Sequence, residues 1–287
     1  VVNRALTGPI NINNDHSDSM GARDSGWLQI YSENAQEAYD NMLMAHRIAE
    51  DPAVRLPVMV CMDGFITSHA VENIVLEDDE TAKKFVGDYR PEQYLLNPEQ
   101  PVAYGPYGIS AYYIEMKKAQ TEAMDSARAV IRRVSDEYAA VTGRHYGLIE
   151  RYRMDDAEYA VVVIGSSAGT GKDAVDTLRA RGVHAGLIKV RSFRPFPTDE
   201  LTEALKACRA GASMDKTDSF SGNGGPLGAE TRAALYHAGL HLPALDIVYG
   251  LGGRDVRVDD FYQVFDMLQD AARGGEIPMY SYIGVRE

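Results

Sequence analysis

The stretch "YAVVVIGSSAGTGKDAVDTLRARGVHAGLIKV", Tyr159 to Val190, decides the fold of this chain. An apolar run of strand length leads through a glycine-rich turn into a helical pattern that stops at Gly182, and a second apolar run follows. This order predicts a βαβ unit with parallel strands that are buried on both faces. The small residues of the turn would let the helix and the strand approach closely. The sequence therefore predicts an α/β fold with a parallel sheet.

Similar alternation of helical patterns, apolar strands and glycine-rich loops recurs earlier and later in the chain. Ser32–Glu50 has apolar residues at helical spacing, and "LPVMVCM" (Leu56–Met62) after it reads as a buried strand. Near the C-terminus, "ALDIVYG" (Ala244–Gly250) reads as another strand and leads into a second glycine-rich loop, "GLGGRD". That loop could present backbone amides to an anion or could be a sharp turn.

A different pattern separates these two regions. From Glu77 to Gly108, clustered acids and repeated prolines interrupt all periodicity, and a long helix is expected from Ala111 to Thr142, with Gly143 placed to end it. We therefore expect three parts. They are residues 1–76, residues 77–155 as a connecting arm and long helix, and residues 156–287 as a second α/β domain.

Composition narrows the class of protein. The 287 residues carry a net charge of −13, which disfavours nonspecific binding to nucleic acid. No apolar run approaches the roughly 18 residues that a membrane helix needs, so no membrane association is expected. The two cysteines, Cys61 and Cys208, indicate a reducing cytoplasm and are too few for an ordinary iron–sulfur cluster.

The glycine-rich turn Gly165–Asp173 suggests two alternative chemistries. A phosphate-binding loop would need four residues between its glycines and a hydroxyl after the lysine, but five residues and Asp173 stand there. The same turn contains G-x-S-x-G around Ser167, so a serine hydrolase stays open as an alternative of a different class. A tight packing turn is the simpler interpretation.

Histidines give little support for a metal site. His237 with His241, and His69 with Glu72, have spacings that suit one helix face, but each pair offers only two ligands. We expect no metal site in this chain. His69 follows a predicted strand end, which is where ligand sites of parallel sheets cluster.

Six stretches together carry a resemblance that covers essentially the whole chain from Arg4 onward. The chain resembles the α subunits of pyruvate:ferredoxin oxidoreductases in "NRALTGPININNDHSDSMGARDSGWLQIYSENAQEAYD", "PVMVCMDGFITSHAVE", "GSSAGTGKDAVDTLRARGV", "VRSFRPFP", "MDKTDSFSGNGGPL" and "GLGGRDV". Relatives that act on other 2-oxo acids or on oxalate share this layout.

The resemblance implies a fold, cofactors and partners. It implies part of a pyrimidine-binding domain of the thiamine-diphosphate type, followed by a transketolase C-terminal-like domain. A β subunit would hold the diphosphate, its Mg²⁺ and a 4Fe–4S cluster, while γ and δ subunits complete the complex and carry further clusters. Such a complex converts pyruvate and CoA to acetyl-CoA and CO2 and reduces ferredoxin. A noncatalytic assembly subunit is a third interpretation.

The resemblance also implies candidate site residues. Family members have a further N-terminal part, with the carboxylate that activates the cofactor, and we expect that part to be missing here. Arg4 matches the arginine that binds the substrate carboxylate, a role that a planar guanidinium suits. Asp63 and His69 are candidates for lining the site or the subunit interface.

The run "DHSDSMGARDSGW" follows Arg4 closely and is dense in charge. We expect its Asp15, His16, Asp18, Arg23 and Asp24 to form a structural network of ion pairs and hydrogen bonds at the subunit contact.

Overall fold

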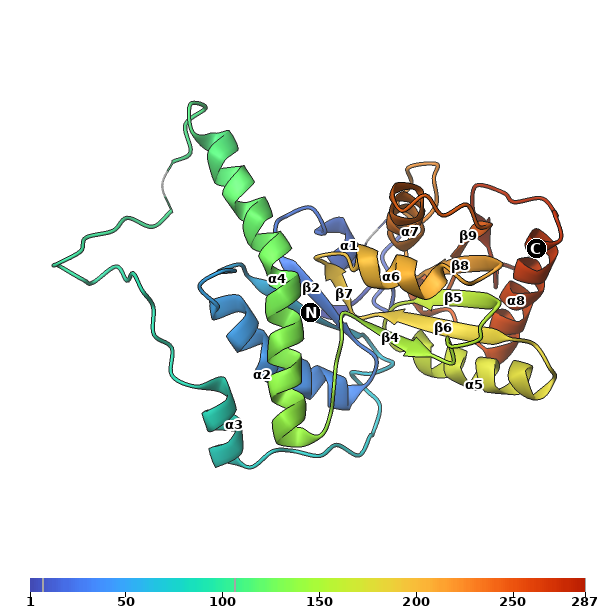
Figure 1. Cartoon of the computed structure of the whole chain (residues 1–287), viewed down its shortest axis with the longest axis horizontal. Coiled ribbons are helices and arrows are strands. Elements are labelled where there is room, and N and C mark those ends of the chain that lie inside the picture. The colour runs from blue at the N-terminus through green and yellow to red at the C-terminus, as the bar shows by residue number, and fades with distance from the viewer. Residues whose placement is uncertain (7, 106, 287) are drawn as a thin grey trace.

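The computed structural model describes residues 1–6, 8–105 and 107–286, which form two sheets side by side (Figure 1). In chain order the elements are β1 (Val2–Asn3), α1 (Ser17–Gly21), β2 (Leu28–Ser32), α2 (Ala35–Glu50), β3 (Val58–Asp63), α3 (Asp79–Val86), α4 (Tyr113–Thr142), β4 (Ile149–Tyr152), β5 (Tyr159–Val163), α5 (Ser167–Ala180), β6 (Ala185–Val190), β7 (Ser192–Arg194), α6 (Thr198–Leu205), β8 (Ala210–Asp215), α7 (Pro226–His237), β9 (Ala244–Val248), the short 3-10 helix η1 (Leu251–Gly253), α8 (Val258–Ala272) and β10 (Ser281–Tyr282).

The larger sheet contains the predicted βαβ unit. Its order is β10-β9-β8-β5-β6-β4, and every neighbouring pair is parallel except β4 with β6. Helices α5 and α8 cover one face, while α6 and α7 cover the other (Figure 1). A Cβ at Gly171 of α5 would lie 2.5 Å from Leu187 Cδ1, whereas one at Gly169 would meet only Glu33 Oε1 at 3.6 Å. The small residue that close packing requires is therefore Gly171.

The smaller sheet has the order β1-β3-β2-β7, with β7 antiparallel to β2. Helices α2, α3 and α4 pack against it around a separate apolar core. Two strands lie in the sheet that the predicted boundaries would not assign them to. Strand β7, which comes after residue 156, belongs to the smaller sheet, and β4, which comes before it, pairs with β6 of the larger sheet. The division at residues 76 and 155 stays a prediction.

Local signals explain the ends of the helices. The Asn34 side chain accepts a hydrogen bond from Glu37 N and so begins α2, and Gly143 takes a left-handed conformation at the end of α4. Helix α3 lies in the stretch that we expected to be irregular. Asp78 caps it, and its Phe85 packs edge-on against Tyr138 of α4. Burial of the Phe85 side chain stabilises this helix, which is too short to be stable by itself.

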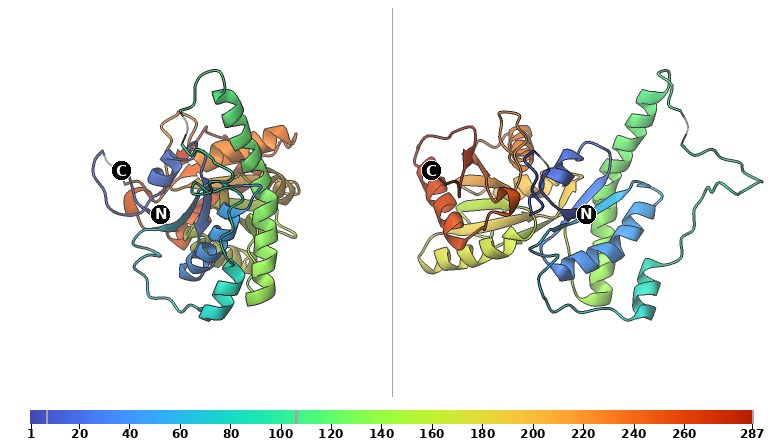
Figure 2. Two further views of the ribbon diagram at one scale, coloured as in Figure 1. Left: turned by 90° about the vertical axis from the view of Figure 1, so that its left-hand side faces the viewer. Right: turned by 180° about the vertical axis from the view of Figure 1, so that it is seen from behind.

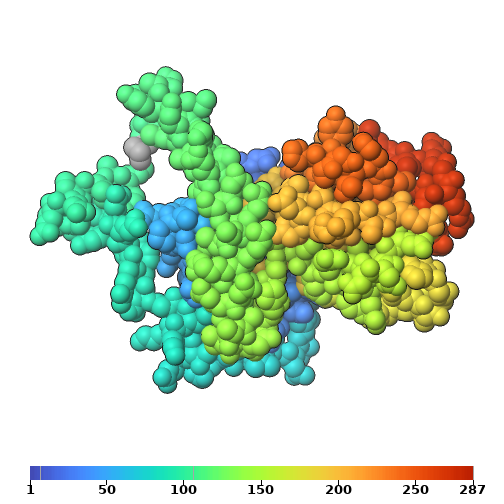
Figure 3. Space-filling view, viewed as in Figure 1, coloured from blue at the N-terminus to red at the C-terminus, as the bar shows by residue number. Residues whose placement is uncertain are grey.

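The segment between α3 and α4 extends away from both sheets (Figures 1 and 2). The space-filling view shows it as a projection beside the N-terminal half of α4 (Figure 3). It leaves large apolar side chains exposed, including Leu96 at 86% and Tyr107 at 90%. Among the described helices, none has the length and apolar character needed to cross a membrane.

Candidate functional site

The carboxyl ends of strands from both sheets meet at the junction between them. Asp63 ends β3 and is fully buried, and its carboxylate contacts Lys216, which follows β8, at 3.0 Å. His16 Nε2 lies 2.7 Å from the other carboxylate oxygen, and Ser166, after β5, donates both its backbone N–H (3.1 Å) and its hydroxyl. Candidate Asp63 thus sits inside the molecule, where it joins the two sheets.

Opposed effects act on the pKa of Asp63. Burial disfavours its charged form, but Lys216 and His16 outweigh burial and hold the pKa of this carboxyl well below its ordinary value. Asp63 is therefore ionised at neutral pH, and the ionic contact with Lys216 lies wholly out of solvent.

The glycine-rich turn before α5 binds this internal carboxylate and not a phosphate. Ser166 donates hydrogen bonds to Asp63. Lys172, which stands where a phosphate-binding loop has its lysine, pairs with Glu33 at 2.8 Å. The hydrolase alternative also loses its basis. Ser167 is 3% exposed, and in the part of the chain that the structure describes no histidine hydrogen-bonds to it.

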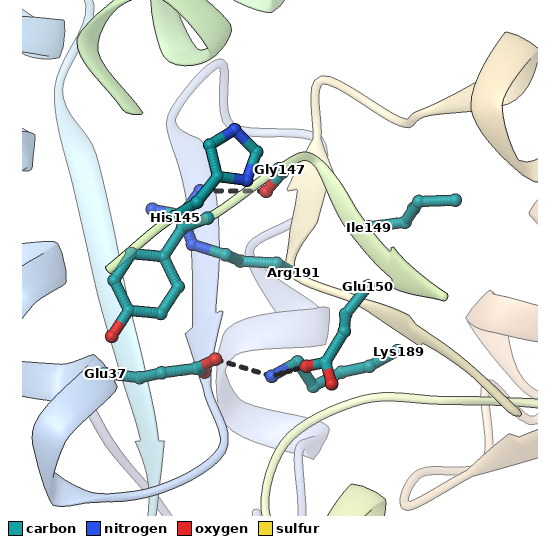
Figure 4. Close-up of a pocket in the computed structure, with 8 residues that line it drawn as sticks. Glu37, His145, Gly147, Ile149, Glu150, Lys189 and Arg191 are labelled. Atoms are coloured by element: carbon teal, nitrogen blue, oxygen red, sulfur yellow. Dashed lines mark hydrogen bonds and ion pairs between the residues drawn. The ribbon is translucent and has the colours of Figure 1, made fainter. Parts of the chain in front are cut away.

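A second charged cluster continues the junction at the end of β6 (Figure 4). Lys189 is buried, and its Nζ lies 2.6 Å from both Glu33 and Glu150 and also contacts Glu37. Burial opposes its charge, but the three carboxylates raise the pKa of Lys189. Glu33, Glu37 and Glu150 are close enough together to bind a cation. The ammonium already supplies that charge, so the trio does not fit a metal ion.

The run Asp15 to Asp24 forms a network of hydrogen bonds and ion pairs within the chain, and its place at the subunit contact stays a prediction. It ties the short helix α1 to both sheets and to the "GLGGRD" loop, whose amides therefore point at protein groups and not at an external anion. The contacts are Asp15 Oδ2 with Gly252 N (3.1 Å), Asn14 O with Gly253 N (2.6 Å), His16 with Asp63, Asp18 with Asn3 Nδ2 (2.8 Å) and Arg4 N (2.9 Å), Arg23 with Asp24 (3.7 Å), and Asp24 with Arg194 (3.4 Å).

Candidates Arg4 and His69 lie together on the surface, beyond the ends of β1 and β3. The Arg4 guanidinium carbon lies 5.1 Å from the centre of the Phe65 ring, and the ring of Phe65 stacks on that of His69 at 4.6 Å. Strand β1 is a two-residue edge strand, and Arg4, which directly follows it, is exposed. Among the described residues, no hydrogen bond or ion pair is made by its guanidinium.

Two further buried carboxylates sit at the start of α7. Asp215 accepts from the backbone N–H of Leu227 (3.0 Å) and Gly228 (2.9 Å), and Asp246 accepts from Gly225 N (3.1 Å) and Arg232 (3.2 Å). Burial, reinforced by Asp246, raises the pKa of Asp215 well above its ordinary value. Burial also raises the pKa of Asp246 to about 6, although Arg232 opposes this.

This carboxylate pair predicts a pH dependence of stability. Between about pH 4 and pH 6 the folded chain keeps a proton on Asp246 that the unfolded chain has released. The free energy of unfolding should therefore fall as pH rises through this window. Urea unfolding of the purified protein at pH 4 to 8 measures the slope. Asp246→Asn removes one of the two carboxyl groups and should reduce the slope, leaving the part that the buried Asp215 contributes, and an equal slope in the variant would contradict this account.

The geometry also tests whether this chain can hold a diphosphate. Three places with backbone N–H groups in a glycine-rich turn are filled by the protein's own oxygen acceptors: Asp63 at Ser166, Asp215 at the start of α7, and Asp15 at Gly252. These turns do not fit a diphosphate, and the Glu33 trio does not fit its metal. Among the predicted site residues within the described ranges, the Arg4 guanidinium and His69 Nε2 remain available to a ligand, whereas the carboxylate of Asp63 is buried and paired.

The sequence reasoning missed Lys216, Lys189 and Phe65. The two lysines carried a readable signal, since each stands within or directly after a buried strand, where an unpaired charge is costly. The role of Phe65 depends on its backbone conformation, which the sequence does not show.

Comparisons with known proteins agree with the fold. Residues 1–136 match the family model described as pyruvate flavodoxin/ferredoxin oxidoreductase, thiamine diphosphate-binding, and residues 157–261 match pyruvate:ferredoxin oxidoreductase core domain II. The solved 2-oxoglutarate:ferredoxin oxidoreductase from Magnetococcus marinus aligns with 94% of this chain and 48% of its own, at a TM-score of 0.59 and 14% identity. The predicted α/β fold class is thereby confirmed.

Curated relatives match along the full chain. Pyruvate synthase subunit PorA of Thermotoga maritima is 44% identical over 100% of this chain and 72% of its own length. The PorA subunit of Methanocaldococcus jannaschii is 40% identical over the same shares. The α subunit of the NADH-dependent phenylglyoxylate dehydrogenase of Aromatoleum evansii is 35% identical over 97% of this chain and 69% of its own. With both family models matched in order and relatives this similar, the chain belongs to the family of pyruvate:ferredoxin oxidoreductases.

Proposed function

We propose that this chain is the α subunit of a 2-oxoacid:ferredoxin oxidoreductase that acts on pyruvate. The complex would convert pyruvate and CoA to acetyl-CoA and CO2 and pass the electrons, one at a time, to ferredoxin. The observation that carries the proposal is Arg4, whose guanidinium stands at the carboxyl end of parallel strands with its donors available. The PorA relatives support pyruvate as the substrate.

Arg4 would bind the carboxylate of the 2-oxo acid. A guanidinium offers two parallel N–H donors to a carboxylate and keeps its charge at any working pH. That carboxylate leaves as CO2, so the site needs to orient it more than to bind it tightly. The exposed position of Arg4 suits a site that a second subunit completes.

We expect the cofactors to be shared between this chain and its partner subunits. Thiamine diphosphate would bind between this chain and a β subunit, with the diphosphate and Mg²⁺ on the β side, because the described residues here do not fit them. The 4Fe–4S clusters would lie in partner subunits, because such a cluster needs four thiolate ligands and this chain has two cysteines, Cys61 and Cys208, which are both buried. The γ and δ subunits and ferredoxin complete the set of partners, and two free cysteines suit the cytoplasm.

A second candidate substrate has one observation in its favour. The phenylglyoxylate dehydrogenase relative is nearly as similar to this chain as several PorA subunits are. Another 2-oxo acid, or oxalate, is therefore the alternative within the family.

A comparison of the isolated chain with the co-purified complex tests the proposal. The chain alone should show no iron–sulfur absorbance and no tight thiamine-diphosphate binding, while the complex should show both, with β, γ and δ chains identified by mass spectrometry. Stoichiometric iron on the chain alone would refute the division of labour. Labelling of Ser167 by a fluorophosphonate probe would instead revive the hydrolase.

A further inference from the structure

Phe65 combines two properties that are unusual for a large apolar residue. Its φ is +61°, in the left-handed region that bulky side chains avoid, and its ring is 38% exposed. The ring belongs to none of the three apolar cores. It contacts instead the guanidinium of Arg4 and the imidazole of His69.

The turn that presents this ring is held from both sides. Gly64 donates its N–H to Asn3 O at 3.1 Å, and a Cβ at Gly64 would lie 2.4 Å from that same oxygen. The carbonyl of Asp63 accepts from Thr67 N (3.0 Å) and Ser68 N (3.2 Å). The buried junction at Asp63 therefore anchors the turn, and only glycine fits where the turn approaches β1.

Ser68 fixes the two rings relative to each other. Its hydroxyl oxygen accepts from Phe65 N at 2.9 Å and lies 2.8 Å from His69 Nδ1. The hydroxyl therefore contacts both the Phe65 backbone and the His69 imidazole. One hydroxyl thus sets both the strained backbone and the ring stacked on it.

We propose that Phe65, backed by His69, is a positioning residue that sets the plane of the Arg4 guanidinium for the substrate carboxylate. The inference rests on the proposed function of Arg4. An arginine has a long, mobile side chain, and a paired contact with a carboxylate requires its planar group in one orientation. A ring under the guanidinium face favours that orientation through the cation–π attraction and leaves the N–H donors at the edge available.

Structural strain at this position fits a functional role better than a role in folding. Strained backbone conformations persist where the surroundings impose them, and they cluster at ligand sites. Because the ring lies outside the cores, its removal should leave stability nearly unchanged. The effect should appear where Arg4 acts, in the binding of the carboxylate.

The test uses the assembled complex with Phe65→Leu, which keeps a bulky residue on the same backbone but removes the ring. We expect KM for pyruvate to rise roughly five- to thirty-fold, with kcat within about twofold of wild type. Phe65→Tyr, which keeps the ring, should restore most of the affinity. Tyr262→Leu is a control for the loss of a ring beside an arginine, because the Tyr262 ring lies 4.8 Å from the guanidinium carbon of Arg181. It should leave KM unchanged.

Other outcomes would overturn the inference in distinguishable ways. If Arg4→Ala impairs turnover but Phe65→Leu leaves KM unchanged, Phe65 does not position the arginine, and the proposed function stands. A lower melting temperature, or loss of partner subunits, in Phe65→Leu would mean that the ring is structural. If Arg4→Ala itself has no effect, Arg4 does not bind the substrate carboxylate, and the inference falls with that role. In the double variant, Phe65→Leu should add nothing to Arg4→Ala, and additive losses would also refute the coupling.

Discussion

Arg4→Ala in the assembled complex is expected to lower kcat/KM for pyruvate by roughly thirty- to thousand-fold. A charged hydrogen bond to the substrate carboxylate is lost, and such a loss costs on the order of 2–4 kcal/mol. Arg4→Lys should recover only part of the activity, because an ammonium keeps the charge but not the two parallel donors. Steady-state reduction of ferredoxin or viologen against pyruvate concentration measures the effect.

Two controls separate substrate binding from a structural role of Arg4. Thiamine-diphosphate content should hardly change, since the diphosphate is expected on the partner. Arg209→Ala, which removes another exposed arginine, paired with Glu158 and lying over the Tyr159 ring, should leave kcat/KM at the wild-type value. An unchanged kcat/KM in Arg4→Ala would remove Arg4 from the site, and loss of cofactor together with activity would assign it to the subunit interface.

Lys216→Met is expected to lower the free energy of unfolding by about 3–5 kcal/mol. The substitution leaves the carboxylate of Asp63 buried without its main counter-charge, and an uncompensated buried charge is costly. The joint between the two sheets should weaken in particular, because Lys216 follows β8 of one sheet and Asp63 ends β3 of the other. Urea unfolding at pH 7.5, followed by circular dichroism, measures the loss.

A second substitution shows whether charge is the cause. Asp63→Asn combined with Lys216→Met removes both charges, so at least half of the lost stability should return. Lys206→Met, which breaks an exposed pair with Glu203, should cost no more than about 1 kcal/mol. If the double variant is as unstable as the sum of the two single variants, the junction is not held by this ion pair.

Periodicity in the sequence was sufficient for the longest apolar strands and for three of the long helices, but not for the shorter elements. The apolar runs that became β3, β5, β6 and β9, and the helical spacing in α2, α4 and α5, are local patterns that burial then enforces. The short helix α3 was missed because its one buried side chain, Phe85, is covered by Arg47 of α2 and Tyr138 of α4, which are far from it in the chain.

The sequence was sufficient to name candidate site residues by their side-chain chemistry, but not to say which of them lie together. Arg4, Asp63 and His69 were named from the sequence, yet the structure separates them, with Asp63 in the interior and the other two on the surface. Their connection is the turn after β3, in which the backbone carbonyl of the buried Asp63 accepts from Thr67 N and Ser68 N and so anchors the segment that presents Phe65. A left-handed phenylalanine and an ion pair across 153 residues leave no local trace in the sequence.

The measurement that tests the account most directly is the 2-oxo-acid specificity of the purified complex. We expect CoA-dependent ferredoxin reduction with kcat/KM highest for pyruvate, and much lower for 2-oxoglutarate, phenylglyoxylate and oxalate. A complex that contains this chain, thiamine diphosphate and intact clusters, but reduces ferredoxin with none of these acids, would contradict the proposed function.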